Sequence, residues 1–108
     1  MIDLSPEQLA TVQRLLAARA PECEVRAFGS RVTGNAKPYS DLDIVLHGPT
    51  RLSLVRLAAL REAFAESELS IRVDVIDWHA ISENFRNIIS AKCAMLQKSR
   101  ETEKEEGT

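Results

Sequence analysis

The stretch that decides the fold runs from Gly29 to Asp43 and reads G-S-R-V-T-G-N-A-K-P-Y-S-D-L-D. It places a turn of small residues ahead of two aspartates, Asp41 and Asp43, at the entry of the apolar run 42–46. Because side chains alternate across a strand, both carboxylates are predicted to project from the same face. Two carboxylates on one face can chelate a divalent cation.

The patterns on either side of this stretch predict an α+β fold, with a small mixed sheet of three to four strands covered by helices. Ser5 is expected to cap the first helix, with Pro6 at its first position and Gln8 completing a capping box. The predicted elements are a helix from residue 6 to near Pro21, a strand over 23–28, a helical turn over 31–33, a strand over 42–46, a helix over 52–67, a strand over 71–76 and a helix over 80–96.

Length and charge limit what the chain can do. Its 108 residues fit one domain, expected over 1–98, followed by a charged, mobile tail over 99–108. With a net charge of −2, the chain has no broad positive potential that would bind nucleic acid. Cys23 and Cys93 lack a metal-binding spacing, which favours two reduced thiols. Because the chain shows neither a signal peptide nor an apolar run of about 20 residues, we expect no membrane association and a cytoplasmic location.

A third carboxylate, Asp74, lies inside the predicted strand 71–76. Like charges on neighbouring strands raise each other's pKa or require a cation. Mg²⁺ prefers oxygen ligands and leaves positions for phosphate, so Asp41, Asp43 and Asp74 are predicted to be metal ligands for one or two ions. Asp74 is either a third ligand or the base, and Asp77 is its main competitor for this role.

The turn itself has features of a phosphate site. Gly29 allows the backbone to approach phosphate closely, and Ser30 follows it either as a phosphate donor or as a helix cap. Arg31 and Lys37 are candidate counter-charges, and Ser40 is placed to orient a carboxylate or to touch phosphate. We therefore predict a nucleotide-binding site that includes Gly29, Ser30, Arg31 and Ser40.

These residues resemble a known family. The pattern G-S-x-x-x-G, five residues and then S-D-x-D is similar to that of the minimal nucleotidyltransferases of the DNA polymerase β superfamily. The segment V-D-V-I-D around Asp74 resembles the place where that family carries its third catalytic aspartate. The resemblance covers residues 5–96 and implies a nucleotidyltransferase fold with Asp41, Asp43 and Asp74 as catalytic residues.

The resemblance also implies a function. Stand-alone proteins of this kind are commonly antitoxins paired with HEPN-domain ribonuclease toxins. We therefore expect an enzyme that uses ATP and Mg²⁺ to transfer AMP to a toxin hydroxyl, expected to be a tyrosine, and that forms a hetero-oligomer with this toxin. The transfer would neutralise the toxin.

Other functions remain open at this point. The chain could neutralise a toxin by binding alone, with an idle site, or it could modify a small molecule as the aminoglycoside nucleotidyltransferases do. A nucleic-acid polymerase is disfavoured by the mild acidity. His47 and His79 lack a metal-ligand spacing and are given no role, and Trp78 is predicted to be a packing residue.

Overall fold

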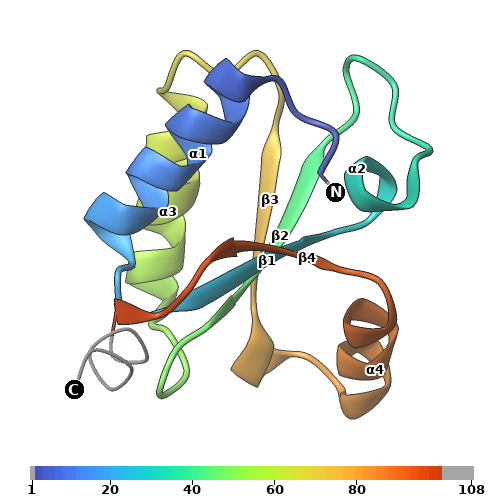
Figure 1. Cartoon of the computed structure of the whole chain (residues 1–108). Coiled ribbons are helices and arrows are strands. Elements are labelled where there is room, and N and C mark those ends of the chain that lie inside the picture. The colour runs from blue at the N-terminus through green and yellow to red at the C-terminus, as the bar shows by residue number, and fades with distance from the viewer. Residues whose placement is uncertain (1, 101–108) are drawn as a thin grey trace.

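A computed structural model of the chain describes residues 2–100 and contains a four-stranded mixed sheet in the order β3-β2-β1-β4. The strand β1 pairs in antiparallel fashion with both β2 and β4, whereas β2 and β3 run parallel. In Figure 1, β4 lies nearest the viewer and β3 lies farthest away. The strands are β1 (Glu24–Phe28), β2 (Leu42–His47), β3 (Val73–Asp77) and β4 (Ala94–Gln97).

Helices lie on both faces of this sheet, which confirms the predicted α+β class. The helices α1 and α3 lie together against one face and α4 lies on the other side, while the short α2 follows the end of β1 and adds Val32 to the core under α1 and α3 (Figure 1). Within residues 2–100, no helix is long and apolar enough to cross a membrane. The helices are α1 (Pro6–Arg19), α2 (Ser30–Thr33), α3 (Leu54–Ala65), the 3-10 turn η1 (Trp78–Ala80) and α4 (Glu83–Ala91).

The alternation of side chains along β2 divides the sheet into two different faces. Leu42, Ile44 and Leu46 are fully buried in the core that α1 and α3 cover. Asp43, Val45 and His47 project from the opposite side, which we call the α4 face. Val45 is also buried, so β2 has apolar side chains packed on both of its faces, as predicted for a central strand.

The start of α1 confirms the predicted capping box. The backbone N–H of Gln8 donates to Ser5 Oγ at 3.1 Å, and the backbone N–H of Ser5 donates to Gln8 Oε1 at 2.9 Å. Both bonds satisfy amides that have no partner inside a helix. The helix ends at Arg19, just before Pro21.

The predicted helix over 80–96 is wrong in its extent. Ser82 caps α4 by accepting from the N–H of Phe85 at 3.1 Å, and the helix ends at Ala91. The following residues form β4, in which Ala94 pairs with Ala27 of β1. Leu96 is buried in the core and not on a helix stripe. A four-residue edge strand is too short for a clear alternation, and its pairing partner is about 70 residues away along the chain.

The remaining differences lie at element ends. The third strand is shifted from the predicted 71–76 to Val73–Asp77, and α3 is shorter than the predicted 52–67. The backbone N–H of Arg100 donates to the carbonyl of Pro21 at 2.9 Å. The first residues of the predicted tail over 99–108 therefore lie against the domain, and residues 101–108 fall outside the described part of the chain.

Candidate active site

Two of the predicted carboxylates face each other across adjacent strands. Asp43 of β2 and Asp74 of β3 are partners in the parallel register, and both project from the α4 face. Asp41 directly precedes β2. Asp43 is half-buried, whereas Asp41 and Asp74 are exposed to solvent. The fold therefore gathers at one end of the sheet three aspartates of which the first and the last are 33 residues apart in sequence.

The environment of Asp43 makes its charge unfavourable. Burial raises the pKa of this carboxyl above its ordinary value, and the negative charges of Asp74 and Asp41 raise it further. A bound cation would offset both effects. Mg²⁺ prefers hard oxygen ligands such as carboxylates, and its coordination shell keeps open positions for phosphate oxygens.

The protein side chains do not by themselves form a complete metal site. Among residues 2–100, no group of three or more His, Cys, Asp or Glu side chains is arranged to hold a metal ion. Mg²⁺ is commonly held in proteins by one or two carboxylates together with water and substrate phosphates. The arrangement therefore fits a cation that arrives with a nucleotide better than a resident structural ion.

Gly29 is packed directly against Asp43. Its backbone has φ 79° and ψ −157°, a region that is essentially restricted to glycine. A Cβ atom at this position would lie 2.3 Å from Asp43 Oδ2. The turn after β1 therefore brings bare backbone against the carboxylate, and α2 begins at the next residue, Ser30.

Arg31, predicted from the sequence to be a nucleotide-binding residue, lies buried beneath the loop over 34–41. Its Nε donates to the carbonyl of Ser40 at 3.0 Å, and Nη1 donates to the carbonyl of Asp3 at 2.8 Å. Nη2 donates to the carbonyls of Lys37 and Pro38 at 3.3 and 3.1 Å. The guanidinium thus fastens the loop that carries Asp41 to the N-terminal segment. Contact of Arg31 with a nucleotide remains a prediction.

Replacing Arg31 with lysine is expected to loosen this loop. A lysine ammonium cannot reproduce the planar fork that reaches four carbonyls, so we expect the free energy of unfolding to fall by about 2 kcal/mol or more. Hydrogen exchange of the amides over 34–41 should become faster. Urea unfolding and hydrogen exchange measure the two effects. Exposed Arg51 offers the control Arg51→Lys, and equal behaviour of the two variants would contradict the role given to Arg31.

Ser40 closes a turn within the same loop. Its Oγ accepts from the backbone N–H of Lys37 at 2.8 Å, and its own N–H donates to the carbonyl of Lys37 at 3.0 Å. Lys37 is exposed. Ser40 therefore closes the turn that directly precedes Asp41. Its contact with phosphate stays a prediction.

Asp77, the competitor of Asp74, has a structural role. Its side chain is 2% exposed and lies on the core side of β3. Oδ2 accepts from the backbone N–H of Leu52 at 2.7 Å, and Oδ1 accepts from that of His79 at 3.0 Å. Asp77 therefore joins two loops beneath the sheet, and Asp74 is the carboxylate of β3 that faces Asp43.

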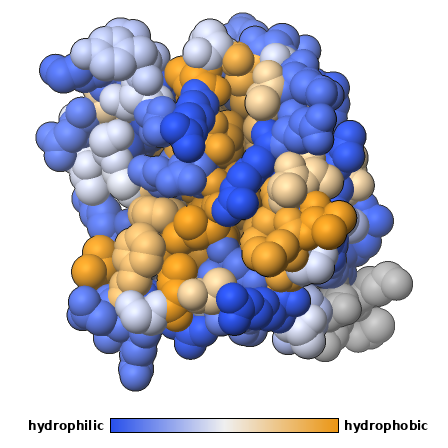
Figure 2. Space-filling model, turned by 180° about the vertical axis from the view of Figure 1, so that it is seen from behind, coloured by the Kyte–Doolittle hydropathy of each residue, from blue (hydrophilic) through white to orange (hydrophobic). Residues whose placement is uncertain are grey.

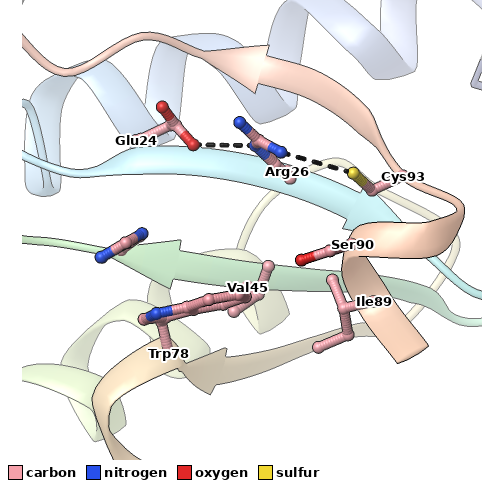
Figure 3. A pocket seen from close by; sticks show the side chains of 8 residues that line it. Glu24, Arg26, Val45, Trp78, Ile89, Ser90 and Cys93 are labelled. Carbon is pink, nitrogen blue, oxygen red and sulfur yellow. Dashed lines mark hydrogen bonds and ion pairs between the residues drawn. The ribbon is translucent and has the colours of Figure 1, made fainter. Parts of the chain in front are cut away.

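The α4 face also holds a cavity of about 350 Å³ at the end away from Asp43 (Figure 3). Within it, Arg26 Nε donates to Glu24 at 2.8 Å, and Arg26 also contacts the Cys93 sulfur. His47 stacks on Trp78 with ring centroids 5.0 Å apart, and Arg86 lies 5.3 Å from the Trp78 centroid. These contacts give Trp78 the packing role that its sequence context predicts. The lining residues are Glu24, Arg26, Val45, His47, Trp78, Ile89, Ser90 and Cys93.

A mixed sheet with paired aspartates on adjacent strands and a glycine–serine turn beside them is the arrangement of a nucleotidyltransferase. The family model of the nucleotidyltransferase domain matches residues 9–107, and the chain belongs to this family. One curated relative is a probable protein adenylyltransferase, MntA, from Haemophilus influenzae strain Rd. The two proteins are 43% identical over 101 residues, which cover 94% of this chain and 89% of the relative.

Solved structures share the fold at lower sequence identity. A chain from the crystal structure of a toxin–antitoxin complex with AMP-PNP superposes with a TM-score of 0.74 at 22% identity, over 89% of this chain and 77% of that one. Another comes from a tri-AMPylated Shewanella oneidensis HEPN toxin in complex with an MNT antitoxin. It has a TM-score of 0.67 at 20% identity, over 91% of this chain and 76% of that one. These likenesses confirm the nucleotidyltransferase fold expected from the sequence.

Proposed function

We propose that this chain is an antitoxin that acts as a Mg²⁺-dependent protein adenylyltransferase. It transfers AMP from ATP to a hydroxyl, expected to be a tyrosine, of a HEPN ribonuclease toxin and thereby neutralises the toxin. The observation that carries the proposal is the gathering of Asp41, Asp43 and Asp74 beside the glycine–serine turn. The 43% identity to an MntA relative named as an adenylyltransferase supports the same reaction.

The three carboxylates take the metal-binding roles in this proposal. Asp41 and Asp43 would hold Mg²⁺ together with phosphate oxygens of ATP, and Asp74 would serve as a further ligand or as the base. When bound, the cation supplies charge neutralisation at the reacting phosphate. The raised pKa of Asp43 supports this assignment, because a positive charge nearby would offset the burial and the negative neighbours that make its charged form unfavourable.

The turn after β1 takes the phosphate-binding role. Gly29 leaves room for backbone to approach an anion closely, and Ser30 adds a hydroxyl donor at the start of α2. Arg31 and Ser40 hold in shape the loop over 34–41, which leads from α2 to Asp41. This part of the chain would fix the triphosphate while the aspartates act at the α-phosphate.

The proposed reaction is a single displacement at the α-phosphorus of ATP. The acceptor oxygen forms a bond to the α-phosphorus of ATP, and the bond between this phosphorus and the bridging oxygen to the β-phosphate breaks. Pyrophosphate leaves, and the hydroxyl proton passes to Asp74 or to water. The protein contributes chiefly by positioning the reactants and by arranging charge. Since ATP is available inside cells, the proposal places the protein in the cytoplasm.

Labelled ATP tests the proposal directly. The chain is incubated with its HEPN partner, Mg²⁺ and ATP labelled at the α-phosphate, with EDTA as a control for the metal. We expect label on the toxin, loss of its ribonuclease activity and no transfer with EDTA. An unlabelled toxin under saturating conditions would refute the transferase. If toxin neutralisation also survived Asp43→Ala, binding alone would explain the antitoxin.

A further inference from the structure

A groove follows the outer edge of the sheet and ends at the candidate active site. It has a volume of about 430 Å³ and lies between α3 and the edge strand β3. We call it the α3–β3 groove. The view from behind in Figure 2 shows apolar side chains in hollows between hydrophilic ones on the side of the molecule where β3 lies. The groove is lined by Arg61, Phe64, Ala65, Leu69, Ile71, Arg72, Val73 and Asp74.

Along this groove the outer edge of β3 pairs with no other strand of residues 2–100. The N–H of Leu42 donates to the carbonyl of Arg72 at 2.9 Å, so residue 72 turns its backbone toward β2. Backbone direction alternates along a strand, and Val73 and Val75 therefore turn theirs outward. Arg61 Nη2 already donates to the carbonyl of Val75 at 2.8 Å. An edge of this kind accepts an extended segment of another chain.

The side chains of the groove combine apolar walls with positive charge. Phe64, Ile71 and Val73 are almost fully buried and form its apolar part. Arg61 and Arg72 are exposed and add two positive charges, in a chain whose net charge is −2. Asp74 is the acidic residue of the lining. The groove therefore suits a segment with an apolar or aromatic side chain and a nearby carboxylate.

The position of Asp74 connects the groove to the chemistry. In the proposed function Asp74 acts on the attacking hydroxyl, either as a further ligand of the metal or as the base. The Gly29–Ser30 turn holds the triphosphate across the sheet on the β1 side. An acceptor that approaches along β3 would meet Asp74 before it meets the phosphates. The groove thus lies on the acceptor side of the site.

We infer that the α3–β3 groove is the docking site for the extended segment of the partner protein that carries the acceptor tyrosine. An acidic residue of that segment faces Arg72, and an apolar residue packs beside Leu69. This inference rests on the proposed function, since it assigns where that function's protein substrate lies.

The test separates toxin docking from nucleotide binding. Arg72→Glu places a negative charge on the rim of the groove, and Arg72→Gln removes the positive charge. For Arg72→Glu we expect the KM for the HEPN toxin, and the Kd of the complex, to rise about tenfold or more, which corresponds to about 1.4 kcal/mol. Arg72→Gln should show a smaller rise. For the neutral variant Arg72→Gln, the affinity for AMP-PNP with Mg²⁺ and kcat at saturating toxin should stay within about twofold of the parent protein.

The exposed residue Arg51, which is not part of the groove lining, provides the matched control Arg51→Glu. Equal toxin KM and Kd values for Arg72→Glu and the parent protein would overturn the inference. A parallel loss of AMP-PNP affinity in Arg72→Gln would also overturn it, because Arg72 would then act on the nucleotide. If the parent protein binds toxin but transfers no AMP, the proposed transferase fails, and the Kd of the Arg72 variants still decides whether the groove docks the toxin.

Discussion

Replacing Asp43 with asparagine is expected to reduce AMP transfer by about 100-fold or more while leaving the fold intact. The change keeps the size of the side chain but removes a charged oxygen from the centre of the aspartate cluster. Removal of one electrostatic contact at a reacting centre typically lowers the rate about 10²–10³-fold. Transfer of labelled AMP to the toxin measures the effect. Glu62→Gln, an exposed change on α3, should retain the parent rate.

The same variant should be at least as stable as the parent protein in the absence of metal. The pKa of Asp43 is raised in the folded state, so the stability linked to its protonation is present at low pH and is lost as pH rises through the folded-state pKa. At neutral pH the charged carboxylate therefore opposes folding, and a neutral amide removes this opposition. Thermal unfolding with EDTA provides the measurement. A clear fall in Tm would show that Asp43 has a stabilising structural role.

Replacing Gly29 with alanine is expected to impair both stability and activity. Alanine in this backbone conformation costs about 1–3 kcal/mol of strain. In addition, its Cβ would lie 2.3 Å from Asp43 Oδ2, so the carboxylate or the turn must move. A displacement of this kind at a reacting group can cost about 100-fold in rate. Urea unfolding and AMP transfer at saturating ATP measure the two losses.

Gly34→Ala is the matched control for this variant. Gly34 also has a positive φ, 90°, but a Cβ there meets nothing within 4 Å. Gly34→Ala should therefore lose about 1–2 kcal/mol of stability from strain while keeping kcat close to that of the parent protein. If both alanine variants lost activity equally, contact between Gly29 and Asp43 would not be the cause.

Most elements of the fold are predictable because their signals are local. The capping box at Ser5 and the proline at the first helical position define the start of α1 without any tertiary contact. The apolar run after Asp43 likewise predicts a strand buried on both faces. The segment 94–97 has no such local signal, because it becomes a strand by pairing with β1 and not through a pattern of its own.

The candidate site likewise has residues that can be predicted from the sequence and residues whose role depends on the tertiary structure. The spacing of Asp41 and Asp43 and their place beside a glycine–serine turn can be read directly from the chain. The spatial role of Arg31 could not be predicted, because an arginine next to such a turn favours a phosphate contact, whereas its buried side chain reaches carbonyls on two separate segments. The choice between Asp74 and Asp77 depended on which face of β3 each occupies.

The sequence by itself determined the class of protein through a resemblance, since the glycine–serine turn and the aspartate pair form a short-range pattern that can be compared directly with that of a known family. Only the tertiary structure decided that Asp74 lies opposite Asp43, that residues 94–97 complete the sheet, and that a groove with two arginines leads along β3 to the aspartates. The physical reason is that strand register and edge pairing depend on contacts between segments far apart in the chain, which no local pattern specifies.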